Sequence, residues 1–200
     1  HAGLVGEYLI EDLTRIPTEV DYASELRYRN PIIEEGTLAI AVSQSGETAD
    51  TLAALREVEL KGAMALGIVN VVGSTIAREA DGGIYIHAGP EVSVTSTKSY
   101  TSTVVAFALL ALQLGRVRDL GPGDGSRLIS GLAALPDGIA TVLAAEDTMA
   151  EVARDLVAPA AGMFFVGRVG GYPVAQEGAQ KLKEVSYVHA EAYPAAELKH

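Results

Sequence analysis

Segments with the pattern of a buried strand alternate with helical segments through most of this chain. Residues 37–42 (TLAIAV) and 63–69 (AMALGIV) are short apolar runs, and each precedes a helical pattern, over residues 48–61 and 74–80. Strands separated by helices pair in parallel, because the chain must cross back over the sheet between them. The alternation therefore predicts an α/β fold, with a parallel sheet flanked by helices on both faces.

Further elements extend this arrangement toward both ends, and Ser74 is the expected N-cap of the 74–80 helix. In chain order they are a helix over residues 2–16, a strand over 18–22, a strand over 83–86, a helix over 97–115, helices over 126–143 and 148–157, a strand over 163–166 and a helix from Pro173. The 97–115 helix is almost wholly apolar, which is typical of a core or interface helix.

Charge and composition exclude several classes of function. Fifteen basic against 26 acidic residues make a net charge of −11 with no basic cluster, which argues against nucleic acid and anionic membranes as partners. The longest apolar stretch, residues 104–112, is far shorter than the ~20 residues of a membrane span. With no cysteine there is no disulfide or thiolate site, so a cytoplasmic location is the simplest expectation. The four histidines lack ligand spacing, and neither a metal nor a cofactor is expected.

Two short segments far apart in the chain resemble each other. Residues 23–28 read ASELRY and residues 195–200 read AAELKH, and each follows an amphipathic helix. We interpret them as two copies of one unit. The predicted domains are residues 1–145 and the beginning of a second domain, residues 146–200.

The second copy places a strand and a Gly-rich turn, residues 167–171, before its helix, whereas the first copy starts directly at the helix. By this analogy the first copy lacks its opening strand and loop, and the second is incomplete. The chain is thus expected to be part of a longer protein.

A hydroxyl-rich segment, residues 43–48 (SQSGET), joins the 37–42 strand to the next helix. Ligands of open parallel sheets bind at the carboxyl ends of strands, next to helix N-termini. Ser43, Gln44, Ser45 and Thr48 can therefore converge with free N–H groups on one phosphate. The alternative is that Ser45 or Thr48 merely caps the helix, but capping normally needs a single residue.

A second polar cluster, residues 93–103 (SVTSTKSYTST), begins the long apolar helix. It can present hydroxyl and N–H groups to a ligand, or it can be an ordinary Ser/Thr-rich helix start.

In the last predicted helix, Glu177, Lys181 and Glu184 form one polar stripe at positions i, i+4 and i+7. One interpretation is a solvated ladder of ion pairs. The other is that Glu184 is a general base or acid, with Lys181 beside it tuning its pKa.

Several of these segments together resemble the isomerase half of the glutamine–fructose-6-phosphate aminotransferases. They are SQSGETADTLAALR at residues 43–56, NVVGSTIARE, HAGPE, STK and KLKE…HAEAYPAAELKH. SQSGET alone indicates only the wider sugar isomerase (SIS) domain class. The resemblance implies a pair of Rossmann-like SIS domains and conversion of fructose 6-phosphate to glucosamine 6-phosphate. A separate glutaminase domain, which this chain does not contain, would supply the ammonia.

The resemblance also implies roles for particular residues. Ser43, Gln44, Ser45 and Thr48 would bind the sugar phosphate. Val94 and Ser96 would contact the sugar. Glu184 would move a proton between C1 and C2, with Lys181 close to it. His200 would assist ring opening in the neighbouring subunit of a homodimer.

Two family features are not found in the sequence, a Gly-Thr-Ser segment just before His1 and an imine-forming lysine near the extreme C-terminus, a role that Lys199 does not take. We therefore expect the isolated chain to bind weakly or incompletely. A sugar-phosphate sensor without turnover and a related SIS deglycase are the alternative functions. A sensor needs the 43–48 segment but not the pair formed by Glu184 and His200.

Overall fold

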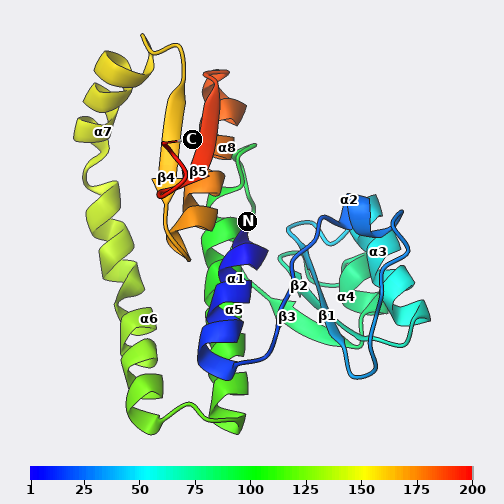
Figure 1. The fold of residues 1–200 in the computed structure, drawn as a ribbon. Coiled ribbons are helices and arrows are strands. Elements are labelled where there is room, and N and C mark those ends of the chain that lie inside the picture. Colours follow the sequence, from blue (N-terminus) through cyan, green and yellow to red (C-terminus); the bar gives the residue numbers. More distant parts are fainter. Residues whose placement is uncertain (200) are drawn as a thin grey trace. The chain divides into compact units, whose positions relative to one another are not determined.

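The computed structural model describes residues 1–199, which form two compact units. One unit is the segment Glu19–Ala106, and the other combines His1–Thr18 with the chain from Phe107 onward (Figure 1). The predicted domain boundary at residue 145 falls in the short break between two helices, α6 (Pro122–Leu143) and α7 (Glu146–Val152). The repeat of two copies stays a prediction.

The Glu19–Ala106 unit contains a three-stranded parallel sheet in the order β1-β2-β3. Its elements are α2 (Ala23–Leu26), β1 (Leu38–Ser43), α3 (Ala49–Leu60), β2 (Met64–Val69), α4 (Thr75–Glu79) and β3 (Gly82–Tyr85). Because the three strands pair in parallel, their carboxyl ends share one edge of the sheet. A helix or a loop follows each strand at this edge. The predicted parallel α/β architecture is confirmed.

A small apolar core joins this sheet to its helices. Its buried members are Leu55 of α3, Ala65 and Val69 of β2, and Ile76 of α4. Ala65 and Ile76 are fully buried, and burying a side chain as large as isoleucine stabilises the fold by roughly 1.5–3 kcal/mol. The core therefore fixes the end of β2 and the start of α4, next to the loops that matter for function.

The second unit holds α1 (Ala2–Thr14), most of the apolar part of α5 (Thr97–Val117), and the C-terminal elements. Those elements are α6, α7, the π-helical turn Ala153–Val157, β4 (Met163–Gly167), α8 (Gly171–Ser186) and β5 (Ala190–Pro194). Strands β4 and β5 pair in parallel, with Phe165 opposite Ala192. Helix α8 packs against both strands, as Figure 1 shows.

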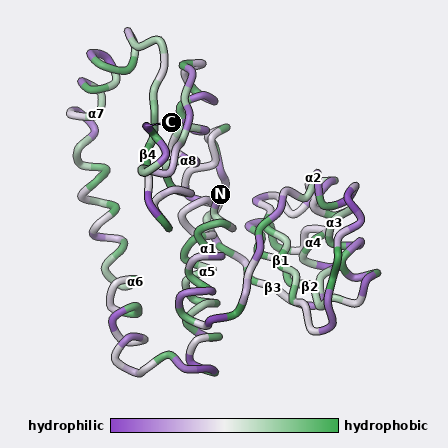
Figure 2. The backbone as a smooth tube through the Cα atoms, in the orientation of Figure 1, coloured by the Kyte–Doolittle hydropathy of each residue, from purple (hydrophilic) through white to green (hydrophobic). Residues whose placement is uncertain are grey.

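Helix α5 has 21 residues and is long and apolar enough to span a membrane. Its apolar side chains are nevertheless used inside the protein, since Ala106, Phe107 and Ala111 are buried. The Phe107 ring lies where a Cβ on Gly6 of α1 would stand, only 2.5 Å from the ring carbons. Figure 2 shows hydrophobic colouring over much of this helix. In total, 39% of the apolar window of this helix is buried inside the protein, and the core helix of a soluble protein can pass the same test of length and apolarity.

One predicted strand was wrong, one strand was not predicted, and one predicted N-cap residue is in place without a side-chain hydrogen bond. Residues 18–22 form no strand: α1 ends at Arg15 in a left-handed conformation, and the exposed Tyr22 side chain finds no neighbouring strand. Strand β5 was missed because it is only five residues long and contains Glu191 and Pro194. Ser74 is the N-cap residue of α4, but its side chain makes no capping hydrogen bond.

Candidate functional site

The 43–48 loop lies at the carboxyl end of β1 and leads directly into α3. Ser43 is buried, and its hydroxyl accepts a hydrogen bond from the Gly46 amide at 3.0 Å and lies 3.0 Å from the Thr48 hydroxyl. Ser45 accepts from the Glu47 amide at 3.2 Å. The loop is therefore closed by its own hydroxyls, as expected of a preorganised binding loop.

Helix capping does not account for these hydroxyls. Thr48 is the N-cap residue of α3, but its side chain makes no capping hydrogen bond and turns to Ser43 instead. The N–H groups of the first turn of a helix have no partner within the helix. The Thr48 side chain does not cap them, and they lie next to the loop at the positive end of the helix dipole, a combination that suits an anion.

The loop is also tied to the start of α4. Glu47 accepts hydrogen bonds from the amide and the hydroxyl of Thr75, at 2.8 and 2.7 Å, and these bonds lower the pKa of the Glu47 carboxyl. The Ile76 amide donates to the Gly46 carbonyl at 3.0 Å. Gly46 has φ +67°, and a Cβ there would collide with the side chain of Ser74. Glycine is thus required in the loop on two grounds.

The second polar cluster precedes and begins α5. Ser96 has φ +56°, which is uncommon for a residue other than glycine, and its hydroxyl lies 2.7 Å from that of Ser99. Val94 is 87% exposed, so its side chain is available to a ligand and contributes little to the core. Glu91 accepts hydrogen bonds from the amide and hydroxyl of Ser99 at 3.0 and 2.7 Å. Glu91 was not among the site residues predicted from the sequence.

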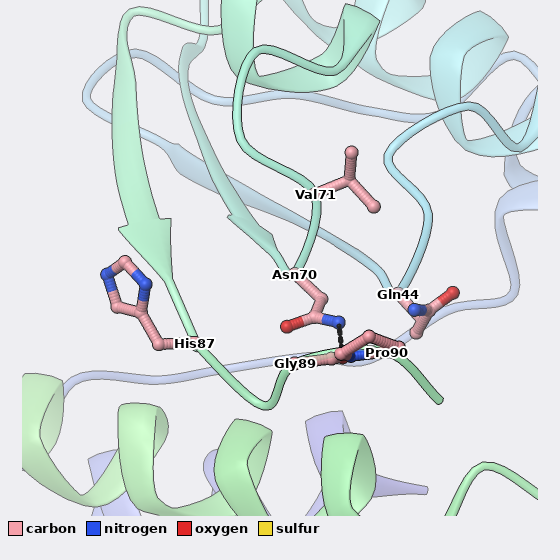
Figure 3. Close-up of a pocket in the computed structure, with 6 residues that line it drawn as sticks. All are labelled: Gln44, Asn70, Val71, His87, Gly89 and Pro90. Carbon is pink, nitrogen blue, oxygen red and sulfur yellow. Dashed lines mark hydrogen bonds between the residues drawn. The ribbon is translucent and has the colours of Figure 1, made fainter. Parts of the chain in front are cut away.

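A cavity of about 390 Å³ opens beside the 43–48 loop at the carboxyl edge of the sheet. Figure 3 shows its lining residues, which are Gln44, Asn70, Val71, His87, Gly89 and Pro90. Asn70 bridges two loops, since its amide group donates to the Gly89 carbonyl at 2.8 Å and accepts from the Ala88 amide at 2.9 Å. Only Gln44 was predicted as a site residue. The signal for Asn70 and His87 was their position at the carboxyl end of a strand: Asn70 directly follows β2, and His87 lies two residues after β3.

The predicted residues of α8 belong to the other unit. Glu177 and His1 are each 12% exposed at their side chains, and their Oε2 and Nδ1 atoms are 2.8 Å apart. Lys181 forms its ion pair with Glu177, at 2.6 Å, while exposed Glu184 accepts a hydrogen bond from Gln180 at 3.1 Å. The polar stripe is therefore not a solvated ladder throughout, because Glu177 is largely buried.

Opposing effects act on the pKa of Glu177. Burial by itself raises the pKa, but hydrogen bonds from His1 and Lys181 outweigh burial, and the pKa lies below its ordinary value. The carboxylate therefore stays ionised and holds the Lys181 ammonium. His200, the remaining predicted catalytic residue, lies outside the described residues. Among residues 1–199, no group of three or more acidic or histidine side chains is arranged to hold a metal ion.

Comparisons with known proteins agree on what this chain resembles. A model of the SIS domain family matches residues 1–113. The chain is 54% identical to the glutamine–fructose-6-phosphate aminotransferase (isomerizing) of Chlorobaculum tepidum and 56% identical to that of Symbiobacterium thermophilum. Both matches take in all of this chain but 32% and 33% of the relatives, so the chain spans about a third of their length.

A solved structure matches equally well. The C-terminal domain of the glucosamine-fructose-6-phosphate aminotransferase from Francisella tularensis superposes with a TM-score of 0.94 at 37% identity, covering all of this chain and 56% of that one. The curated relatives and this structure therefore match the chain to the isomerase part of such enzymes. Because the family model covers more than half of the residues, the chain belongs to the SIS domain family.

Proposed function

We propose that this chain is the isomerase part of an enzyme that makes glucosamine 6-phosphate from fructose 6-phosphate and glutamine-derived ammonia. The observation that carries the proposal is the 43–48 loop, whose hydroxyls and helix N-terminus are arranged for an anion. The names of the relatives, at more than half identity over the whole chain, supply the substrate.

The phosphate is held at the 43–48 loop. Ser43, Gln44, Ser45 and Thr48 belong to the loop that precedes the first turn of α3, where N–H groups without a partner in the helix favour negative charge. The overall charge of −11 does not oppose this assignment, since the anion is bound by local dipoles and not by a basic surface. Val94 and Ser96, in the same compact unit, contact the sugar.

The proton transfer belongs to Glu184. Converting the imine of a 2-ketose into a 2-amino aldose removes a proton from C1 and adds one to C2, while the O1 hydroxyl loses a proton and the nitrogen gains one. One carboxylate can carry the proton between the two carbons. Glu184 is exposed, and its hydrogen bond from Gln180 leaves its second oxygen available. The ion pair with Glu177 holds Lys181, which lies about one helical turn before Glu184 on α8.

Further parts of the proposal concern the rest of the protein. His200 assists ring opening, since an imidazole exchanges protons near neutrality, and does so in the site of a neighbouring subunit. The working enzyme is then a cytoplasmic homodimer with a glutaminase domain as its ammonia source. The family relation supports these statements.

Substitution of Glu184 tests the catalytic half of the proposal. In the full-length protein, Glu184→Gln should retain binding of fructose 6-phosphate but lose isomerisation, because the amide cannot carry the proton. Glu151→Gln, which changes another exposed carboxylate in the same unit, is the control and should leave turnover unchanged. Unchanged turnover in Glu184→Gln would refute the role of Glu184, and binding with no turnover in the unaltered protein would favour a sensor.

A double substitution tests the phosphate-binding loop. Ser43→Ala with Thr48→Ala should weaken fructose 6-phosphate binding by about 10-fold or more. One of the two hydroxyl protons is used in the Ser43–Thr48 bond, and the other can form a hydrogen bond to a charged group, which contributes roughly 1.5–3 kcal/mol. Free fructose should be affected far less. Thr141→Ala removes a hydroxyl that bonds only to its own helix at Asp137, and it serves as the control. Equal losses for both sugars would show that the loop does not bind the phosphate.

A further inference from the structure

The segment that carries Val94 and Ser96 is held by a carboxylate with no assigned role. Oε2 of Glu91 accepts from the amide of Ser99 at 3.0 Å and from its hydroxyl at 2.7 Å. The other oxygen lies 3.4 Å from the Thr97 hydroxyl, which donates to it. Glu91, at the start of the 91–99 loop, therefore closes the loop by accepting hydrogen bonds from the first turn of α5.

The number of hydroxyl protons determines which of Ser96 and Ser99 donates in the hydrogen bond between them. An ionised carboxylate only accepts, so the single hydroxyl proton of Ser99 points to Glu91. The Ser96 and Ser99 hydroxyl oxygens are 2.7 Å apart, and one of them must donate. Because the proton of Ser99 is already committed, Ser96 donates to Ser99. The pKa of Glu91 is lowered, first by the Ser99 hydroxyl and then by the Ser99 amide, so Glu91 is ionised at neutral pH.

The backbone N–H group of Ser96 is also used in a hydrogen bond within the loop. Its amide donates to the Ser93 carbonyl at 3.2 Å, which is compatible with its φ of +56°. Ser96 is half-buried, whereas Ser99 is 3% exposed and so cannot exchange its partners with water. Both protons of Ser96 are thus used within the protein, and only the lone pairs of its hydroxyl oxygen are left for a ligand.

We infer that Glu91, acting through Ser99, is a positioning residue that makes Ser96 an acceptor, so that Ser96 recognises a hydroxyl group of the substrate that donates to it. This inference rests on the proposed function, in which Ser96 contacts the sugar. The inference gives the 43–48 loop and the 91–99 loop different hydrogen-bonding roles. The 43–48 loop offers donors to an anion, while Ser96 rejects phosphate and carbonyl oxygens, which have no proton to give.

Sugar analogues test the direction of the bond. Dissociation constants of the full-length protein are measured for fructose 6-phosphate and for its deoxy and deoxyfluoro analogues at each free hydroxyl, since fluorine cannot donate. At one position both analogues should bind about 3- to 10-fold more weakly than the parent sugar, the effect of one neutral hydrogen bond. Ser96→Ala should abolish this difference, and Thr101→Ala, which bonds only to carbonyls of its own helix, should not.

Variants of Glu91 and Ser99 show whether these residues orient the Ser96 hydroxyl or only stabilise the fold. Ser99→Ala and Glu91→Ala release the proton of Ser96, so the fluoro analogue should regain affinity over the deoxy analogue. Glu91→Gln keeps an acceptor oxygen and should restore the original pattern. If the fluoro analogue binds the unaltered protein as well as the parent does, Ser96 donates and the inference is wrong. A pattern that is unaffected by Ser96→Ala refutes it too, whereas failure to bind fructose 6-phosphate at all refutes the proposed function.

Discussion

Replacing Gly46 with alanine should destabilise the Glu19–Ala106 unit by about 2–5 kcal/mol. Gly46 has φ +67°, and the left-handed conformation costs an L-residue roughly 1–2 kcal/mol. The new Cβ would also collide with the side chain of Ser74, which is 2% exposed and has little room to move. Overpacking of a buried site adds roughly 1–3 kcal/mol.

Native-state hydrogen exchange measures this change in the full-length protein. The amides of Ile68 and Val69, in the buried strand β2, report the opening of the unit. Their exchange should accelerate by about 30-fold or more in Gly46→Ala, since every 1.4 kcal/mol is a factor of ten. Fructose 6-phosphate binding should weaken as well, because the altered residue belongs to the loop that we propose binds the phosphate.

Two further variants separate the conformational cost from the collision. Gly36 has φ +83°, and a Cβ added there would meet no atom within 4 Å, so Gly36→Ala should show only the conformational cost of about 1–2 kcal/mol. Adding Ser74→Gly to Gly46→Ala should remove the collision, and it sacrifices no hydrogen bond that the described residues make with the Ser74 hydroxyl. Equal destabilisation by Gly46→Ala and Gly36→Ala would refute the packing argument.

Two predictions concern carboxylates. The pKa of Glu47 is lowered by its hydrogen bonds from Thr75, so its stabilisation of the loop is present above the ordinary value of 4.5 and is lost as pH falls through the lower folded value. The Thr75 amide chemical shift should follow that titration by NMR, and a midpoint at or above 4.5 would contradict it. Glu177→Gln leaves Lys181 without its carboxylate and should destabilise the protein by about 1–3 kcal/mol, as measured by urea unfolding. Exposed Glu184 is the control, and equal losses in Glu184→Gln would refute the importance of burial.

The α/β architecture was predictable because it depends on local patterns. Apolar runs such as residues 37–42 alternate with helical segments, and that alternation leads to parallel pairing. The same reasoning failed for residues 18–22 and for β5, since a short strand is defined by its partner. Whether a five-residue segment pairs with another strand depends on contacts far along the chain.

The 43–48 loop was likewise recognisable from its position after a strand and before a helix. What the residue types left open was whether its hydroxyls cap the helix, and only the folded structure shows Thr48 bonded to Ser43 instead. The necessity of Gly46 was also hidden, because its neighbour Ser74 is 28 residues away in the chain and comes close only through the packing of α4.

The sequence by itself determined the fold class, the place of the 43–48 loop between a strand and a helix, and the likeness to a family, all of which follow from patterns of neighbouring residues. The tertiary structure decided which polar groups pair. It joined Lys181 to Glu177, and it bound Glu91 to Ser99, thereby orienting the hydroxyl of Ser96. Hydrogen bonds are directional and short-ranged, so their partners follow from atomic positions that only the folded chain defines.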